Sequence, residues 1–78
     1  MLKSLIEYIV KTLVEHPENV QISRADRDGA DVLVISVSKN DIGRVIGKDG
    51  QTIKAIRGLA FAVKGDDAIA DIVIDDQE

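Results

Sequence analysis

The chain is organised around one stretch, Ile42-Gly43-Arg44-Val45-Ile46-Gly47-Lys48-Asp49-Gly50-Gln51-Thr52-Ile53. Two glycines frame its central pair Lys48-Asp49, and the apolar pair Val45-Ile46 stands directly before them. After the loop, apolar residues return at spacings of three, four and three, the period of a helix, as Ile53, Ile56, Ala60 and Val63. The stretch therefore predicts a short helix, a tight glycine loop and a second helix.

The predicted loop has the chemistry of a phosphate site. Its two glycines carry no side chain, so a ligand can approach the backbone closely. Its amides lie at the N-terminus of the second helix, where the helix dipole favours an anion. Lys48 adds a mobile positive charge, and Arg44 and Lys54 flank the loop on the adjoining helices. We therefore expect the loop to hold a phosphate.

The net charge is −4 at pH 7, which is unusual for a nucleic-acid binder. Residues 41–57 nevertheless carry a local charge of +2, which leaves −6 on the rest of the chain. The charged residues of that segment are Arg44, Lys48, Lys54 and Arg57 against Asp41 and Asp49. A basic site on an acidic body predicts modest affinity for phosphate and little non-specific attraction to duplexes.

The hydrophobic periodicity predicts six elements in the order α-β-β-α-α-β. We expect helices over about 2–15, 41–46 and 51–64, and strands over about 20–27, 31–38 and 68–74. Asp28-Gly29 is a hairpin signal that makes the first two strands antiparallel, while the two-helix crossover makes the last two parallel. The prediction is an α+β fold, with a three-stranded mixed sheet and three helices on one face.

Particular residues are expected to begin or end these elements. Pro17 should end the first helix, Asn40 or Asp41 should cap the short helix, and Gly65 should stop the long one. We expect Tyr8 to be a partly buried edge residue of the first helix. In the short helix, the apolar residues Ile42, Val45 and Ile46 should face inward.

The pattern Val-Ile-Gly-x-x-Gly-x-x-Ile at 45–53, in its strand–helix–loop–helix setting, resembles the core of a KH domain. KH domains are small modules that bind single-stranded nucleic acid and clamp its backbone with a GxxG loop. The element order resembles the type II KH arrangement over nearly the whole chain. It is similar to that of the bacterial stand-alone KH proteins of the KhpA (YlqC) family. We therefore expect one KH domain over residues 1–78, with its GxxG loop at 47–50.

The resemblance implies a single-stranded RNA-binding protein, acting as a post-transcriptional regulator or RNA chaperone. It implies a groove for about four nucleotides between the loop and the sheet edge. The residues that we carry over to RNA binding are Ile42, Gly43, Arg44, Val45, Ile46, Gly47, Lys48, Asp49, Gly50, Gln51 and Lys54. The apolar members, with Ile53, would form the wall and floor on which bases rest, although burial in the core is an equally good interpretation of Ile42 and Ile46.

The alternative is a module for protein interaction or dimerisation, with weak or no RNA binding of its own. The long helix is apolar around nearly its full circumference at residues 59–63, which predicts exposed apolar area. The expected dimer interface comprises Ala55, Leu59, Phe61 and Ala62. The resemblance likewise implies a homodimer, and a heteromer with a larger KH-containing protein of the KhpB (Jag) type.

Other classes of function fit the sequence poorly. A P-loop needs four residues where Gly43 and Gly47 enclose three, and Asp49 stands where Ser or Thr should hold magnesium. There is no cysteine, and the single histidine, His16, is better explained as a helix-end residue than as a ligand or base. We expect no catalytic residue, metal or cofactor. No apolar run is long enough to span a bilayer, so we expect a cytoplasmic protein that does not enter the membrane.

Overall fold

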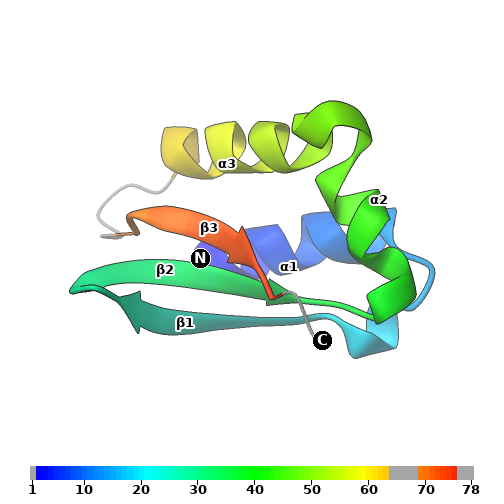
Figure 1. The fold of residues 1–78 in the computed structure, drawn as a ribbon, viewed down its shortest axis with the longest axis horizontal. Coiled ribbons are helices and arrows are strands. Elements are labelled where there is room, and N and C mark those ends of the chain that lie inside the picture. The colour runs from blue at the N-terminus through cyan, green and yellow to red at the C-terminus, as the bar shows by residue number, and fades with distance from the viewer. Residues whose placement is uncertain (1, 64–68, 76–78) are drawn as a thin grey trace.

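The computed structural model describes residues 2–63 and 69–75. Their helices are α1 (Leu2–Leu13), α2 (Ile42–Ile46) and α3 (Gln51–Val63), and their strands are β1 (Gln21–Arg27), β2 (Ala30–Ser36) and β3 (Asp71–Ile74). Three short 3-10 turns join them: η1 (Pro17–Asn19), η2 (Lys39–Asp41) and η3 (Lys48–Gly50). The sheet runs in the order β1-β2-β3, and the helices lie on one of its faces (Figure 1). The predicted α+β fold of a type II KH domain is confirmed.

The first two strands form a hairpin whose turn is set by Asp28 and Gly29. Both residues have positive φ, +56° and +84°, which matches the twist of a two-residue hairpin loop. The Gly29 amide also donates to the Asp26 carboxylate at 2.8 Å. Arg27 pairs with Ala30 directly beside the turn, and the antiparallel register continues to Gln21 and Ser36. The predicted hairpin is confirmed.

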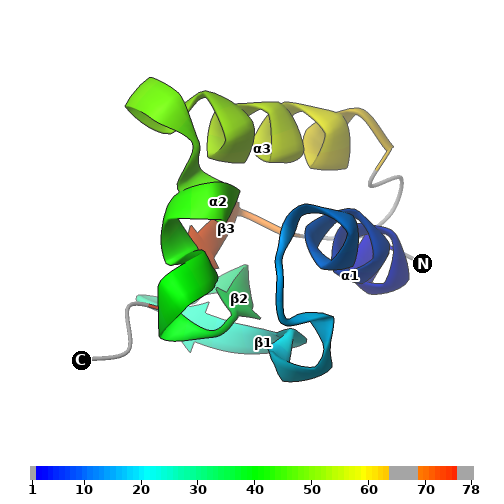
Figure 2. The same ribbon diagram turned by 90° about the vertical axis from the view of Figure 1, so that its right-hand side faces the viewer.

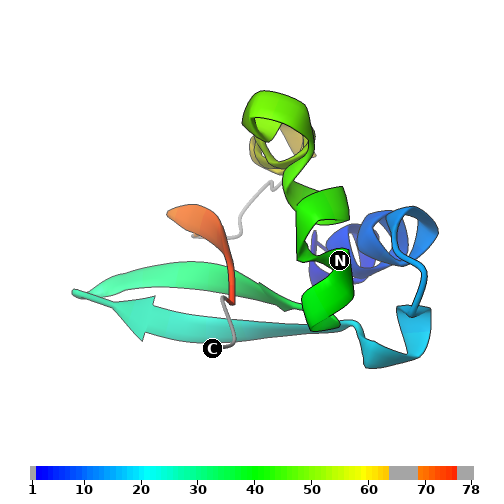
Figure 3. The ribbon, with the colours of Figure 1, turned by 45° about the vertical axis from the view of Figure 1, so that its right-hand side comes forward.

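The third strand returns parallel to the second after the two-helix crossover. Val32 pairs with Asp71 and Ile35 with Ile74, so β2 is the central strand. In the two turned views the helices of residues 2–63 stay on one side of the sheet (Figures 2 and 3). The crossover therefore places α2, the glycine loop and α3 together above the parallel pair.

One apolar core joins the covered face of the sheet to the three helices. Alternate residues of β2 face it, because side chains alternate across a strand. The buried members are Leu2, Ile6 and Val10 of α1, Val20, Ile22, Leu33, Ile35, Val37, Ile69 and Ile72 of the sheet and its ends, and Val45, Ile53, Ile56 and Ala60 of α2 and α3. The stripe predicted for α3 therefore packs at Ile53, Ile56 and Ala60, whereas its expected last member, Val63, is 50% exposed at the end of the helix.

Two predicted burials are wrong. Tyr8 is 68% exposed, because it lies on the solvent side of α1 instead of at the edge of its apolar stripe. Ile46 is 37% exposed, since α2 has only five residues and its last one projects beyond the core. Val45 is buried as expected, and Ile42 packs against the core while half-buried. The exposure of Ile46 places an apolar side chain directly before the glycine loop.

Several boundaries differ from the sequence prediction by one to three residues. The first helix ends at Leu13 instead of residue 15, and the central strand covers Ala30–Ser36 instead of 31–38. The last strand begins at Asp71 within a segment predicted to start at 68. The sequence also predicts an exposed acidic turn at Asp66-Asp67; this turn and the predicted stop at Gly65 lie outside the described residues. Among the helices of residues 2–63 and 69–75, none has the length and apolarity needed to cross a membrane.

Candidate nucleic-acid interface

The glycine loop begins at Gly47, where the backbone takes a conformation that only glycine adopts easily. Gly47 closes α2 by donating its amide to the Gly43 carbonyl at 2.9 Å, and then turns away with φ +77° and ψ 171°. A Cβ at Gly47 would lie 2.7 Å from the Cβ of Thr52, 2.8 Å from the Thr52 nitrogen, and would overlap its hydroxyl. Both the backbone angles and the packing of Thr52 therefore require glycine there.

The remaining loop residues form a single 3-10 turn that leads into α3. Asp49 and Gly50 both have positive φ, +56° and +73°, and Asp is one of the few non-glycine residues that tolerate it. The Gly50 amide donates to the Gly47 carbonyl at 3.1 Å, and the Gln51 amide donates to that of Lys48. The sequence leads us to expect the amides from Lys48 to Gln51 to face a phosphate. Because those of Gly50 and Gln51 are used within the turn, the amides of Lys48 and Asp49 remain for that role.

The cations near the loop fall into two groups. Lys48 and Lys54 are exposed, and neither pairs with a carboxylate among residues 2–63 and 69–75. Arg44 and Arg57 are held in ion pairs with acidic residues from other elements. The lysines are therefore the cations that the free protein leaves available to a phosphate.

Arg57 ties α3 to the strand at the sheet edge. Its Nε donates to the Ile72 carbonyl at 3.0 Å and lies 3.3 Å from the Asp71 carboxylate. Residues three apart on a helix are surface neighbours, so Lys54 lies on the same side of α3 as Arg57. Arg57 contacts β3 from that side of the helix.

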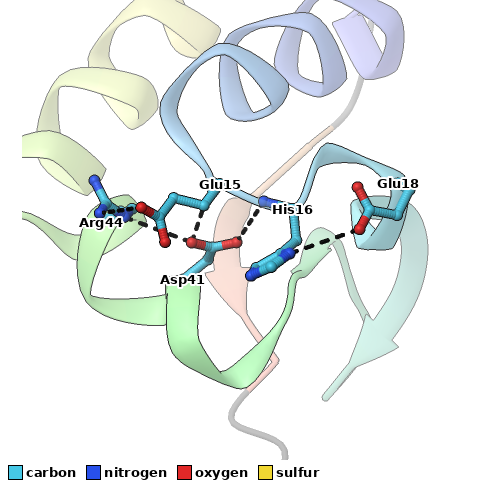
Figure 4. Close-up of polar contacts among 5 residues, drawn as sticks. All are labelled: Glu15, His16, Glu18, Asp41 and Arg44. Carbon is cyan, nitrogen blue, oxygen red and sulfur yellow. Dashed lines mark hydrogen bonds and ion pairs between the residues drawn. The ribbon is translucent and has the colours of Figure 1, made fainter.

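Asp41 has a structural role that the sequence did not predict. It precedes α2, but its side chain makes no capping hydrogen bond there. Its carboxylate is fully buried and accepts the backbone amides of Glu15 and His16 at 3.1 and 3.0 Å (Figure 4). The expected cap is therefore corrected, because the carboxylate is turned toward the chain that follows α1. Asp41 fixes that chain to the start of α2.

Arg44 bridges the same two segments. Its Nη2 lies 3.0 Å from Glu15 Oε2 and its Nε lies 3.6 Å from Asp41 Oδ1 (Figure 4). Folding therefore brings the carboxylates of Glu15 and Asp71 to a segment in which the sequence counted only two acidic residues. With Glu15 and Asp71 added to the two acidic residues of the segment, four carboxylates balance its four cations. The folded site therefore lacks the local excess of positive charge that the sequence predicted.

The apolar residues around the loop differ in what they expose. Ile46 is exposed and Ile42 is half-buried, so both offer surface beside the loop. Val45 is fully buried and Ile53 is 6% exposed. Of the residues expected to form the wall, Ile42 and Ile46 therefore have accessible surface in the free protein, while Val45 and Ile53 lie in the core.

The outward side of α3 carries an apolar surface. Leu59 is 44% exposed, Phe61 39% and Val63 50%, and Ala55 and Ala62 are also exposed. Gly58, which sequence analysis did not single out, lies between the alanines with open space around it. This surface has small residues along its centre and large apolar residues at its margins.

Two concave surfaces in the described part of the chain lie away from the loop. One, of about 370 Å³, is lined by Glu18, Asn19, Gln21, Ser36, Val37 and Ser38. The other, of about 470 Å³, is lined by Lys3, Glu7, Val20, Gln21, Ile22 and Ser23. Within residues 2–63 and 69–75 no three His, Cys, Asp or Glu side chains gather as metal ligands.

Comparison with known proteins gives one consistent family. The family model described as "KhpA/KhpB, KH domain" matches residues 3–74. The chain is 45% identical over 65 residues to the RNA-binding protein KhpA of Thermotoga maritima, covering 83% of this chain and 87% of that protein. It is 52% identical over 62 residues to KhpA of Listeria monocytogenes, with 80% and 82% covered. For KhpA of Bacillus subtilis the identity is 48% over 61 residues, with 78% and 75% covered. No solved structure matches the chain.

Proposed function

Since the chain belongs to the KhpA/KhpB family of KH domains, we propose that it binds single-stranded RNA through the glycine loop at residues 47–50. The observation that carries the proposal is the loop itself. Its central residues Lys48 and Asp49 are exposed, it begins and ends in positive-φ glycines, and the hydrogen bonds of its turn use the amides of Gly50 and Gln51 but not those of Lys48 and Asp49, at the start of a 13-residue helix. That combination suits a backbone phosphate. The relatives from Thermotoga maritima and Listeria monocytogenes are RNA-binding proteins by name.

In this proposal each part of the site has its own task. The amides of Lys48 and Asp49 hold one phosphate, and the ammonium of Lys48 adds charge to it. Gly43, Gly47, Gly50 and Gln51 keep the backbone close to the strand. Ile42 and Ile46 offer an apolar surface for bases, and Lys54 reaches the next phosphate. Because phosphate contacts carry no base information, these lysines determine affinity and leave base preference unchanged.

The charge balance predicts that binding is modest and sensitive to salt. Asp49 places a carboxylate inside the loop, and Arg44 and Arg57 are already paired. Few phosphates are therefore neutralised, so affinity at low salt should be limited and its salt dependence shallow. A domain of this kind fits a post-transcriptional regulator or RNA chaperone that gains affinity by acting with a KhpB-like partner.

The test is filter binding of a short single-stranded RNA, of about eight nucleotides, to the wild type and to Lys48→Asp. Lys48→Asp should weaken binding of every sequence alike and flatten its salt dependence. Lys3→Asp is the matched control, since Lys3 is an exposed lysine of α1 that lines the concave surface of about 470 Å³ beside β1, away from the loop. Equal affinity for wild type and Lys48→Asp, with both folded by circular dichroism, would refute the loop assignment.

A second candidate function is self-association through α3. The supporting observation is the exposed set Leu59, Phe61 and Val63 beside the small residues Ala55 and Ala62. Small residues let two helices approach closely, and a two-fold interface would set the same surface against itself. The same surface could alternatively receive a KhpB-like partner. An interface of this size is modest, so a dimer should dissociate on dilution.

Light scattering on Phe61→Glu tests the dimer. The charge would meet its own copy across the axis, so the variant should be a folded monomer where the wild type is a dimer. Tyr8→Glu is the matched control, because Tyr8 is an exposed aromatic on α1 and should keep the wild-type mass. A monomeric wild type at high concentration would contradict self-association and leave the RNA proposal untouched.

A further inference from the structure

We propose that the carboxylate of Glu15 competes with an RNA phosphate for the guanidinium of Arg44, and so lowers the affinity of the RNA site. The inference rests on the proposed function, and it adds a residue that neither the glycine motif nor its spacing indicates. Glu15 follows α1 and stands 29 residues before Arg44 in the sequence, so only the fold brings the two together.

The contact occupies the part of Arg44 that a phosphate would use. Nη2 is 3.0 Å from Glu15 Oε2, while Nε of the same guanidinium faces the Asp41 carboxylate at 3.6 Å (Figure 4). Arginine binds phosphate best with two parallel N–H donors. Arg44 can therefore hold an RNA phosphate with two donors only if the phosphate displaces at least one carboxylate, or if Nη2 is shared between the phosphate and Glu15.

The two carboxylates differ in how easily they are displaced. Asp41 is fully buried and also holds the amides of Glu15 and His16, so its position is fixed. The Glu15 side chain is 63% exposed and can turn into water without leaving an unsatisfied group. The exchange is therefore asymmetric. Asp41 keeps the guanidinium beside the loop, and Glu15 is the group that gives way.

The charges around Arg44 indicate that Glu15 hinders phosphate binding by Arg44 and does not assist it. Two carboxylates beside one guanidinium leave a net −1 on the cluster, which repels an incoming phosphate. Removing the Glu15 charge makes the cluster neutral and leaves Nη2 open. Because exposed ion pairs are weak, the expected gain in affinity is about two- to fivefold. Glu15 thus reduces binding by a limited factor.

The experiment measures binding of a fluorescein-labelled, mixed-sequence single-stranded RNA of about eight nucleotides, at about 0.15 M salt, where distant charges are screened. Glu15→Gln should bind about two- to fivefold more tightly than the wild type. Glu7→Gln is the matched control: it removes the same charge from a half-buried α1 residue that pairs with Lys11 and lines the concave surface of about 470 Å³ beside β1. It should leave the affinity unchanged. An equal gain from both variants, or weaker binding by Glu15→Gln, would overturn the inference.

A double-mutant cycle separates the ion pair from simple repulsion. If Glu15 acts through Arg44, Glu15→Gln should raise the RNA affinity little or not at all in a protein that already carries Arg44→Gln. The same gain in both backgrounds would show that Glu15 repels RNA directly, and would refute the inference. Should Arg44→Gln fail to fold, Glu15→Asp decides instead, because it keeps the charge but is one methylene too short for the contact. It should bind more tightly than the wild type, and unchanged binding would contradict competition.

These outcomes are distinct from failure of the proposed function. If neither the wild type nor any variant binds the RNA even at low salt, the RNA site itself is refuted, and the inference falls with it. If the wild type binds and Lys48→Asp does not, the site stands. The Glu15 variants then decide the inference by themselves.

Discussion

Replacing Gly47 by alanine should be the most damaging single-methyl change in the glycine loop. Gly47 has φ +77° with ψ 171°, a region that costs other residues about 1–3 kcal/mol. The new Cβ would also lie 2.7 and 2.8 Å from Thr52 atoms, one of which is the backbone nitrogen and cannot move without shifting α3. Adding a packing penalty of about 1 kcal/mol gives a loss of about 2–4 kcal/mol.

Gly50→Ala is the matched control, because the two glycines share the sign of φ and differ in their surroundings. Gly50 has φ +73°, and a Cβ added there would meet open space within 4 Å, so its replacement should cost only about 1 kcal/mol. Urea unfolding of the three proteins measures the difference. In a domain of this size, 1 kcal/mol corresponds to about 4–8 °C in Tm.

A third variant tests the cause of the loss. Thr52→Ala removes the hydroxyl that the new methyl would overlap, but it leaves the Thr52 nitrogen in place. Gly47→Ala should therefore be rescued only in part by Thr52→Ala. If Gly47→Ala and Gly50→Ala lower the free energy of unfolding equally, the packing of Thr52 against Gly47 is not a determinant of the loop, and the reasoning is refuted.

Three further changes follow from other parts of the structure. Ile53→Ala should cost about 2–5 kcal/mol in urea unfolding, because Ile53 is 6% exposed beneath the loop; a loss under about 1 kcal/mol would place it outside the core. Asp41→Asn should lower the free energy of unfolding by about 1–3 kcal/mol, since an amide offers one oxygen where the carboxylate accepts two backbone amides. An unchanged thermal unfolding midpoint would contradict those hydrogen bonds. Asp49→Lys should bind RNA more tightly in filter binding while losing about 1 kcal/mol of stability, because lysine tolerates its φ of +56° less well than aspartate. Weaker binding would show that no phosphate lies at the loop.

Local sequence patterns predicted most of the fold because turn residues and hydrophobic spacing determine where its helices and strands lie. Asp28-Gly29 supplied the positive φ angles of the hairpin, and three of the four residues in the predicted stripe of α3, Ile53, Ile56 and Ala60, are buried, while Val63 at the helix end is exposed. Short elements were predicted less well. A helix of five residues has too few turns for periodicity to decide whether its last residue, Ile46, is buried.

The polar contacts of the candidate site were not predictable from the same patterns. A residue such as Asp41 before a helix is a good N-cap by local rules, and nothing in its neighbourhood indicates a partner 25 residues away. Glu15 and Asp71 reach Arg44 and Arg57 only because α1 and β3 pack against α2 and α3. Counting charges along the sequence therefore overestimated how basic the site is.

The central claim is that RNA lies against the glycine loop, and amide chemical-shift mapping by NMR tests it most directly. On titration with a short single-stranded RNA, we predict that the largest shifts fall on residues 46–54, with the Lys48 and Asp49 amides foremost. Amides of β1 and of the first turns of α1 should not move. Shifts confined to the outward side of α3, around Ala55 and Ala62, or no shifts at saturating RNA, would contradict the account.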